Sequence, residues 1–154
     1  MRTLYSGGYS EHQYSAATLR EKAQLVSAAI PRLLKKFNAD CIVVTGKSGH
    51  SVAFAALMLQ DYPLCVVRKE TDQSHGMGVE GTSGVEVRRY LILDDFIVSG
   101  NTVRTCINTM DAGYDDMQCV GVIAYSECGD LAGSSFYVEQ YAHKIPVIRL
   151  LRGE

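Results

Sequence analysis

The sequence predicts an α/β fold, with a mainly parallel sheet of about five strands, helices on both faces and a small hood. Continuous apolar runs such as 41–45 and 90–93 lack polar alternation, which is typical of strands covered on both faces. Each run is followed by small or polar residues and then by apolar residues at helical spacing. The 154 residues have room for one such domain, 1–154. Its ligand-binding loops would meet at the carboxyl edge of the sheet.

Charge and composition exclude several classes of protein. The formal net charge is −2, so no nucleic-acid surface is indicated and any anion site must be local. The five cysteines include no C-x-x-C pair and are expected to be reduced, and the scattered histidines argue against a zinc site. No segment has the length of a membrane span or the apolar core of a signal peptide, so we expect a soluble, cytoplasmic protein.

The chain opens with a predicted arm and a predicted helix. Residues 1–14 are rich in Gly, Ser and Tyr; we expect the tyrosines to pack on a neighbouring surface or subunit, the alternative being a stacking lid over the site. Residues 15–37 carry apolar side chains on one helical face. Thr18 and Glu21 suit a capping box, and Pro31 should kink or divide the helix.

The first predicted strand, 41–45, leads into a turn and then into a helix over about 51–59. The turn reads Gly46-Lys47-Ser48-Gly49-His50. Its glycines allow positive φ and close approach of the backbone to an anion, and Lys47 supplies charge. The Walker pattern of phosphate-binding loops is absent.

A second predicted strand, 63–67, ends at Arg68 and Lys69. In a parallel sheet these basic residues lie at the same edge as the other loops, the alternative being a solvated charge run. Residues 70–86 are rich in glycine and poor in apolar residues. They predict a mobile lid that excludes water from a site.

The main functional signal lies in residues 90–102. A buried strand ends in Asp94 and Asp95, and a small, hydroxyl-bearing turn at 99–102 opens a helix that continues to about 110. Backbone N–H groups and the helix dipole favour a phosphate at that turn. Two carboxylates would repel a bare anion, so the ligand should also present hydroxyls or a metal ion, as a ribose phosphate with Mg²⁺ does. An ordinary helix cap is the alternative.

Two further strands complete the expected sheet. Residues 118–125 form a near-continuous apolar run, and 145–151 form the last strand, with Pro146 at its start or on an edge. The poorly periodic stretch between them suggests that residues 126–145 contribute a hood over the site.

Residues 90–102 resemble the 5-phosphoribosyl-1-pyrophosphate (PRPP) signature of type I phosphoribosyltransferases, and the resemblance spans most of 38–125. It implies a Rossmann-like domain that transfers 5-phosphoribosyl from PRPP to a nucleobase with Mg²⁺ and releases pyrophosphate, in nucleotide metabolism and nucleobase salvage. The partners would be PRPP, a nucleobase and pyrophosphate, and a homodimer is compatible with the sequence.

The resemblance also implies roles for individual residues. Asp94 and Asp95 would act in catalysis, holding the ribose hydroxyls and Mg²⁺. The 5′-phosphate would be bound by Val98, Ser99, Gly100, Asn101 and Thr102. Pyrophosphate would be bound by Thr45, Gly46, Lys47, Ser48, Gly49, Arg68 and Lys69.

The segment Arg68-Lys69-Glu70 with His75-Gly76-Met77-Gly78 resembles the flexible loop of orotate phosphoribosyltransferases. It implies that Lys69 and His75 assist departure of pyrophosphate, although the lysine that this family carries between these motifs is absent here. Val98 stands where enzymes for 6-oxopurines carry an aspartate. We therefore expect an orotate-like or adenine-like base, placed against Tyr125 and Ile97.

Two other classes of function stay open. A PRPP-binding regulator, or a catalytically silent relative, is favoured by the absent lysine and by Ser48, where many relatives carry Arg. The acidic pair and the composition of the lid favour the enzyme. A general nucleotide-binding domain would keep the phosphate turn without needing Asp94, so replacing Asp94 separates the alternatives.

Overall fold

The computed structural model describes residues 15–68, 78–95, 97, 99–113, 116–126, 135–138, 141 and 143–150. The predictions for the arm 1–14, Lys69, His75 and Val98 lie outside the described residues. The helices and strands are α1 (Ala16–Phe37), β1 (Cys41–Thr45), α2 (Gly46–Leu57), β2 (Leu64–Val67), β3 (Val79–Gly81), β4 (Arg89–Asp94), α3 (Asn101–Gly113), β5 (Gln118–Ala124), β6 (Ser135–Val138) and β7 (His143–Arg149).

The strands form one sheet in the order β3-β2-β1-β4-β5-β7-β6. The inner five strands are parallel, whereas β3 and β6 pair antiparallel at the two edges. The predicted α/β class with a mainly parallel sheet is confirmed, but the described part of the chain has seven strands rather than about five. The two unpredicted strands are the edges, which are only three and four residues long.

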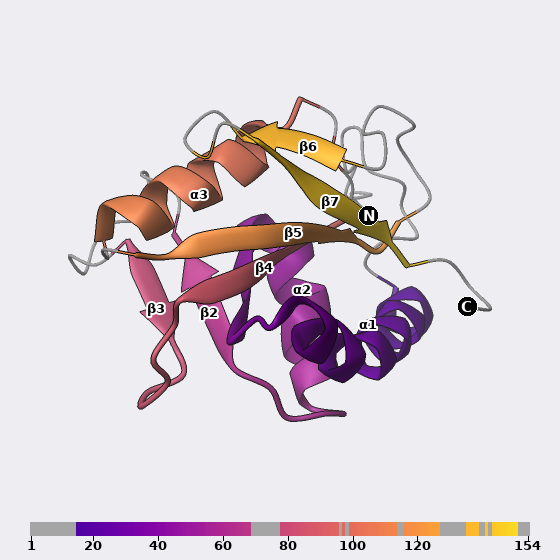
Figure 1. The fold of residues 1–154 in the computed structure, drawn as a ribbon. Coiled ribbons are helices and arrows are strands. Elements are labelled where there is room, and N and C mark those ends of the chain that lie inside the picture. Colours follow the sequence, from indigo (N-terminus) through magenta and orange to yellow (C-terminus); the bar gives the residue numbers. More distant parts are fainter. Residues whose placement is uncertain are drawn as a thin grey trace, which may run out of the picture.

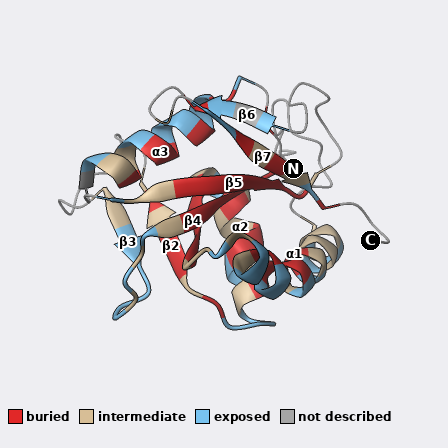
Figure 2. Ribbon diagram, in the orientation of Figure 1, coloured by how far each residue is buried: buried red, intermediate tan, exposed pale blue. Residues whose placement is uncertain are grey.

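Helices cover both faces of the sheet, as predicted. Figure 1 shows α1 and α2 on one side and α3 on the other. Side chains of one strand alternate between two cores: Ile42 and Val44 pack with α1 and α2, whereas Cys41 and Val43 pack with α3. Strands β1, β2, β4 and β5 are therefore buried along most of their length (Figure 2), which is why they read as continuous apolar runs, whereas β7 is partly exposed.

The first helix differs from its prediction at two points. Ser15 is the N-cap, and its hydroxyl accepts the N–H of Thr18 at 3.1 Å, so the predicted capping box starting at Thr18 is wrong. The helix runs undivided through Pro31, which is exposed. It ends at Asn38, whose left-handed backbone (φ 48°, ψ 48°) closes the last turn.

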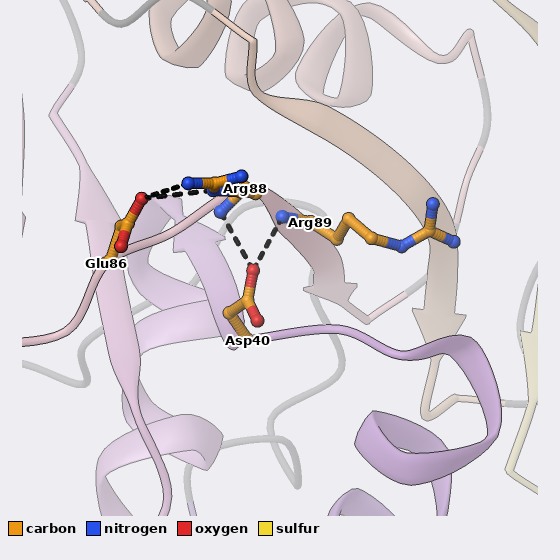
Figure 3. Close-up of polar contacts among 4 residues, drawn as sticks. All are labelled: Asp40, Glu86, Arg88 and Arg89. Atoms are coloured by element: carbon orange, nitrogen blue, oxygen red, sulfur yellow. Dashed lines mark hydrogen bonds and ion pairs between the residues drawn. The ribbon is translucent and has the colours of Figure 1, made fainter.

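A carboxylate and a guanidinium join the end of α1 to the starts of β1 and β4 (Figure 3). Oδ2 of Asp40 accepts the backbone N–H groups of Arg88 and Arg89, both at 2.8 Å. The guanidinium of Arg89 donates to the carbonyls of Phe37 and Asn38, both at 3.1 Å, at the carboxyl end of α1. This junction fixes the amino end of β4, the strand that carries the acidic pair.

Candidate functional site

Three hydrophilic side chains of the described residues are buried, and all three lie at the carboxyl ends of neighbouring strands. Thr45 ends β1 and is 4% exposed, while Asp94 and Asp95 end β4 and are 6% and 4% exposed. The two strands are paired in parallel register at Val43 and Ile92, two residues before Thr45 and Asp94. The prediction that these residues share one edge of the sheet is thus confirmed by the strand order.

This edge lies where the chain changes direction across the sheet. From β1 the chain passes through α2 to β2 on one side, and from β4 it passes through α3 to β5 on the other. Because α2 and α3 cover opposite faces, the carboxyl ends of β1 and β4 flank a topological switch point, where open α/β sheets bind their ligands.

The backbone around the acidic pair is held by hydrogen bonds. Oδ1 of Asp94 accepts the N–H of Asp95 at 2.9 Å, and the carbonyls of the pair accept the N–H groups of Tyr125 (3.2 Å) and Ser126 (2.9 Å). Burial is the main cause that raises the pKa of Cys106 in α3, and the charge of Asp94 adds to it. Asp94 follows Ile92 by two residues in β4, and Ile92 packs with α3, so Asp94 also lies on the α3 side of the sheet, where a carboxylate is stabilised by bound cations or hydrogen-bond donors.

The turn that opens α3 has the features of an anion site. Gly100 adopts φ 74°, and the hydroxyl oxygen of Ser99 accepts the N–H of Asn101 at 3.3 Å. Ser99, Asn101 and Thr102 are exposed, and the first turn contains no acidic residue. Arg104, which sequence reasoning missed, donates to the carbonyl of Ser99 at 2.9 Å. A cation near a helix N-terminus interacts unfavourably with the helix dipole, and a bound anion would offset this repulsion. The unusual position of a cation in the first turn of a predicted helix is the sequence feature that could have identified Arg104.

The predicted anion loop after β1 is not a loop. Helix α2 begins at Gly46, whose φ of 69° makes the turn from the strand, so residues 46–50 are helical and the predicted start near 51 is wrong. Gly49 is buried, and a Cβ there would lie 3.2 Å from the carbonyl oxygen of Leu93, so a glycine allows α2 to pack closely on β4, while its role in binding pyrophosphate stays a prediction. Lys47 is exposed in a first turn that again contains no acidic residue.

Arg68 has a structural role in the described part of the chain, and its predicted contact with pyrophosphate stays a prediction. The guanidinium of Arg68 forms an ion pair with Glu80 in β3, and the backbone N–H of Arg68 donates to the carbonyl of Gly78 at 2.9 Å. Within the predicted lid 70–86, the described residues from 78 onward form β3 and its following turn, so this half of the lid is an edge of the sheet. The rest of the lid lies outside the described residues.

The two residues predicted to contact the base are buried in different cores. Tyr125 is 3% exposed among residues that pack with α1 and α2, and its hydroxyl donates to the carbonyl of Ser48 at 3.0 Å. Ile97 is 4% exposed and packs on the α3 side. Both side chains are buried in the structure, and a contact with the base stays a prediction. The hydroxyl of Thr45, which was predicted to bind pyrophosphate, donates a hydrogen bond to the carbonyl of Val67 at 2.8 Å.

The predicted hood, residues 126–145, overlaps the last two strands. Its described residues include β6 and the start of β7, which pair antiparallel at the edge of the sheet. Pro146 lies in β7 just before Val147, where pairing with β5 begins. A hood over the site stays a prediction. In the part of the chain that the structure describes, no helix is long and apolar enough to cross a membrane, and no three His, Cys, Asp or Glu side chains group around a common metal position.

Comparison with known proteins supports the resemblance found in the sequence. No model of a protein family matches the chain. An orotate phosphoribosyltransferase of Methanocorpusculum labreanum is 26% identical over 100 residues, covering 65% of this chain and 59% of that protein. The chain thus spans less than two thirds of its curated relative.

Solved structures share the fold at low identity. UMP synthase of Leishmania donovani matches with a TM-score of 0.61 and 18% identity, over 86% of this chain and 27% of that one. Orotate phosphoribosyltransferase of Mycobacterium tuberculosis matches with a TM-score of 0.57 and 21% identity, over 90% of this chain and 74% of that one. The predicted resemblance to type I phosphoribosyltransferases, and to the orotate enzymes among them, is confirmed, and at these identities the solved structures establish the fold.

Proposed function

We propose that this protein transfers 5-phosphoribosyl from PRPP to a nucleobase and releases pyrophosphate. One observation carries the proposal: the buried Asp94 and Asp95 end the strand beside the switch point, directly before a helix N-terminus that carries hydroxyls and no acidic residue. Carboxylates that can hold ribose hydroxyls next to a phosphate site match the two ends of a ribose 5-phosphate.

The reaction needs positioning and charge and no nucleophile from the protein. Positive charge grows at the anomeric carbon as pyrophosphate leaves, and the carboxylates of Asp94 and Asp95 would stabilise it through the ribose. The turn from Ser99 to Thr102, with the N-terminus of α3, would hold the 5′-phosphate. The N-terminus of α2 and Lys47 would attract pyrophosphate, and roles for Lys69 and His75 stay predictions.

The donor set fits Mg²⁺. Among the described residues, no third acidic, His or Cys ligand joins the two carboxylates, so the protein alone does not surround a metal ion. Mg²⁺ is usually held in this way, by one or two carboxylates together with substrate oxygens and water. Asp94 and Asp95 would hold the ion, which supplies charge neutralisation for the pyrophosphate oxygens.

For the base, we propose an orotate-like or adenine-like molecule rather than a 6-oxopurine. Support comes from Val98, an apolar residue where an aspartate would serve a 6-oxopurine, and from the name of the curated relative. Tyr125 and Ile97 are buried in the structure, so a contact of either residue with the base would require a local rearrangement.

A PRPP-binding regulator without catalysis remains the second candidate. It is favoured by the lack of a lysine between Glu70 and His75 and by the use of Arg68 in an ion pair with Glu80. Both features reduce the positive charge available to leaving pyrophosphate.

The deciding experiment measures pyrophosphate release from PRPP and Mg²⁺ with orotate, adenine, hypoxanthine, guanine and uracil, alongside calorimetry of PRPP binding. We expect turnover with orotate or adenine, and a loss of roughly a hundredfold or more in Asp94→Asn, as when a group that stabilises transition-state charge is removed. Asp61→Asn, a change at an exposed carboxylate, is the matched control. PRPP binding without turnover selects the regulator, and absence of PRPP binding rejects both candidates.

A further inference from the structure

A cavity of about 600 Å³ lies between the edge strand β3 and the carboxyl end of α3. Its lining is mixed: polar and apolar surface are about equal, and the apolar part comes from Cys65 of β2, Val85, Val87, Met110 of α3 and Met117. Figure 1 shows β3 and the carboxyl end of α3 on the same side of the molecule. The volume falls in the range of pockets that hold small organic molecules.

The cavity is separate from the candidate site. None of its lining residues belongs to the acidic pair or to the turns that open α2 and α3. Val87 and Arg88 precede β4, whereas Asp94 ends it, and Met110 lies in the last turn of α3, whereas Ser99 precedes the first. The cavity thus faces the amino ends of β4 and β5, opposite the switch point.

Sulfur atoms give the cavity a preference for aromatic rings. Met117 is a flexible, polarisable and partly exposed side chain that packs favourably on ring edges, and the Cys65 thiol adds a second sulfur, whereas Met110 is fully buried. Burial limits Cys65 to 8% exposure, so its sulfur lies at the wall and not at the mouth.

Charge at the rim favours a cation over an anion. Oε1 of Glu86 accepts two hydrogen bonds from the guanidinium of Arg88, at 3.0 and 2.7 Å (Figure 3), so that arginine is already neutralised. Asp116 also lines the cavity. Two carboxylates and one guanidinium leave a net negative charge at the cavity.

We propose that this cavity is a second ligand site, which takes a flat aromatic molecule bearing a protonated amine. The ring fills the space between the sulfur-bearing walls, and the ammonium group lies at the rim near Glu86 and Asp116. The site does not depend on the proposed transferase reaction.

Cys65 provides a reporter inside the cavity. A Cβ added at Gly81 would lie 2.8 Å from the Cys65 sulfur, so this thiol packs directly over the glycine of β3. Cys65 keeps some exposure, whereas Cys106 and Cys119 are fully buried, and burial raises the pKa of both. Among these thiols, Cys65 should therefore be alkylated first, and an occupied cavity should shield it.

The test measures alkylation of Cys65 by N-ethylmaleimide, with peptide mass spectrometry, in a Cys128→Ser background, because Cys128 lies outside the described residues. The probes are 1-naphthylmethylamine, 1-naphthalenemethanol and 1-naphthoate, which share a ring system and differ in charge. At ten times its dissociation constant, the amine should slow alkylation about tenfold, since the free fraction falls as 1/(1 + [L]/Kd). The alcohol should protect less and the acid least.

Variants then separate the cavity from general effects. Met117→Trp should fill the cavity and abolish protection, whereas Met58→Trp, at the C-cap residue of α2, which is 88% exposed, should not. Asp116→Asn, which removes a charge with little change in size, should reduce the difference in protection between the amine and the acid. Asp94→Asn should leave protection unchanged, which keeps this result distinct from failure of the transferase proposal.

Fluorescence titration of each naphthyl probe gives binding independently of alkylation. Absence of saturable binding by the amine, equal binding of amine and acid, or protection that survives Met117→Trp in a folded variant would each overturn the proposal. Preferential alkylation of Cys106 or Cys119 would overturn the assignment of Cys65 as the accessible thiol.

Discussion

Asp40 is only half buried, yet replacing it should lower the free energy of unfolding by more than a typical surface substitution does. Its carboxylate accepts two backbone N–H groups at 2.8 Å, so Asp40→Ala removes both hydrogen bonds. Hydrogen bonds to a charged group contribute about 1.5–3 kcal/mol each, and less where the donor is exposed, as the N–H of Arg88 is. The expected loss in the free energy of unfolding is roughly 2–4 kcal/mol, or roughly 4–16 °C in Tm for a domain of this size.

Urea unfolding followed by circular dichroism measures this loss. Asp40→Asn keeps one oxygen acceptor without the charge and should lose about half as much. Asp61→Ala, at an exposed carboxylate, should change stability by less than about 0.5 kcal/mol. If Asp40→Ala behaved like Asp61→Ala, the junction of α1, β1 and β4 would not depend on this carboxylate.

Three further predictions address the candidate site and the core. Ser99→Ala combined with Thr102→Ala should weaken PRPP binding by roughly 1.5–3 kcal/mol for each hydrogen bond lost, and unchanged affinity by calorimetry would remove the phosphate role of the turn. Gly49→Ala places a Cβ 3.2 Å from the Leu93 carbonyl oxygen and should cost about 1–3 kcal/mol in urea unfolding; a neutral effect would mean that α2 can shift freely. Burial raises the pKa of Asp111, so the folded state binds its proton more tightly than the unfolded chain. Its contribution to stability is present at low pH and is lost as pH rises from the ordinary carboxylate pKa through the raised one. Thermal unfolding across that interval should therefore show wild type losing stability relative to Asp111→Asn, and a relative gain would contradict the raised pKa.

The parts of the fold that were predictable are those fixed by local sequence. Strands β1, β2, β4 and β5 are apolar on both faces, so their burial is visible without tertiary information. The acidic pair and the turn after it follow β4 directly, and chain order alone places them at the carboxyl edge. The ion-pairing partner of Arg68 was not visible, because it depends on the register between β2 and the unpredicted β3.

Sequence patterns are least informative where a side chain's direction depends on packing. Tyr125 follows β5 and could have faced the site, but the structure buries it against α2. Residues 46–50 have the composition of a glycine turn, yet a single positive φ at Gly46 suffices to turn the chain and the helix begins there. Helix propensity could not predict this start, because glycine is a weak helix former and Gly49 is kept in the helix by its contact with β4.

The short antiparallel strands at both margins of the sheet bear on how two copies could associate. Strand β3 spans Val79–Gly81 and β6 spans Ser135–Val138, so each margin presents few unsatisfied backbone groups to another chain. Joining two sheets into one continuous sheet would therefore gain few ladder hydrogen bonds. The homodimer compatible with the sequence should instead form through side chains, and such an interface would stay sensitive to substitutions on helix surfaces while tolerating changes in the backbone pairing of β3 and β6.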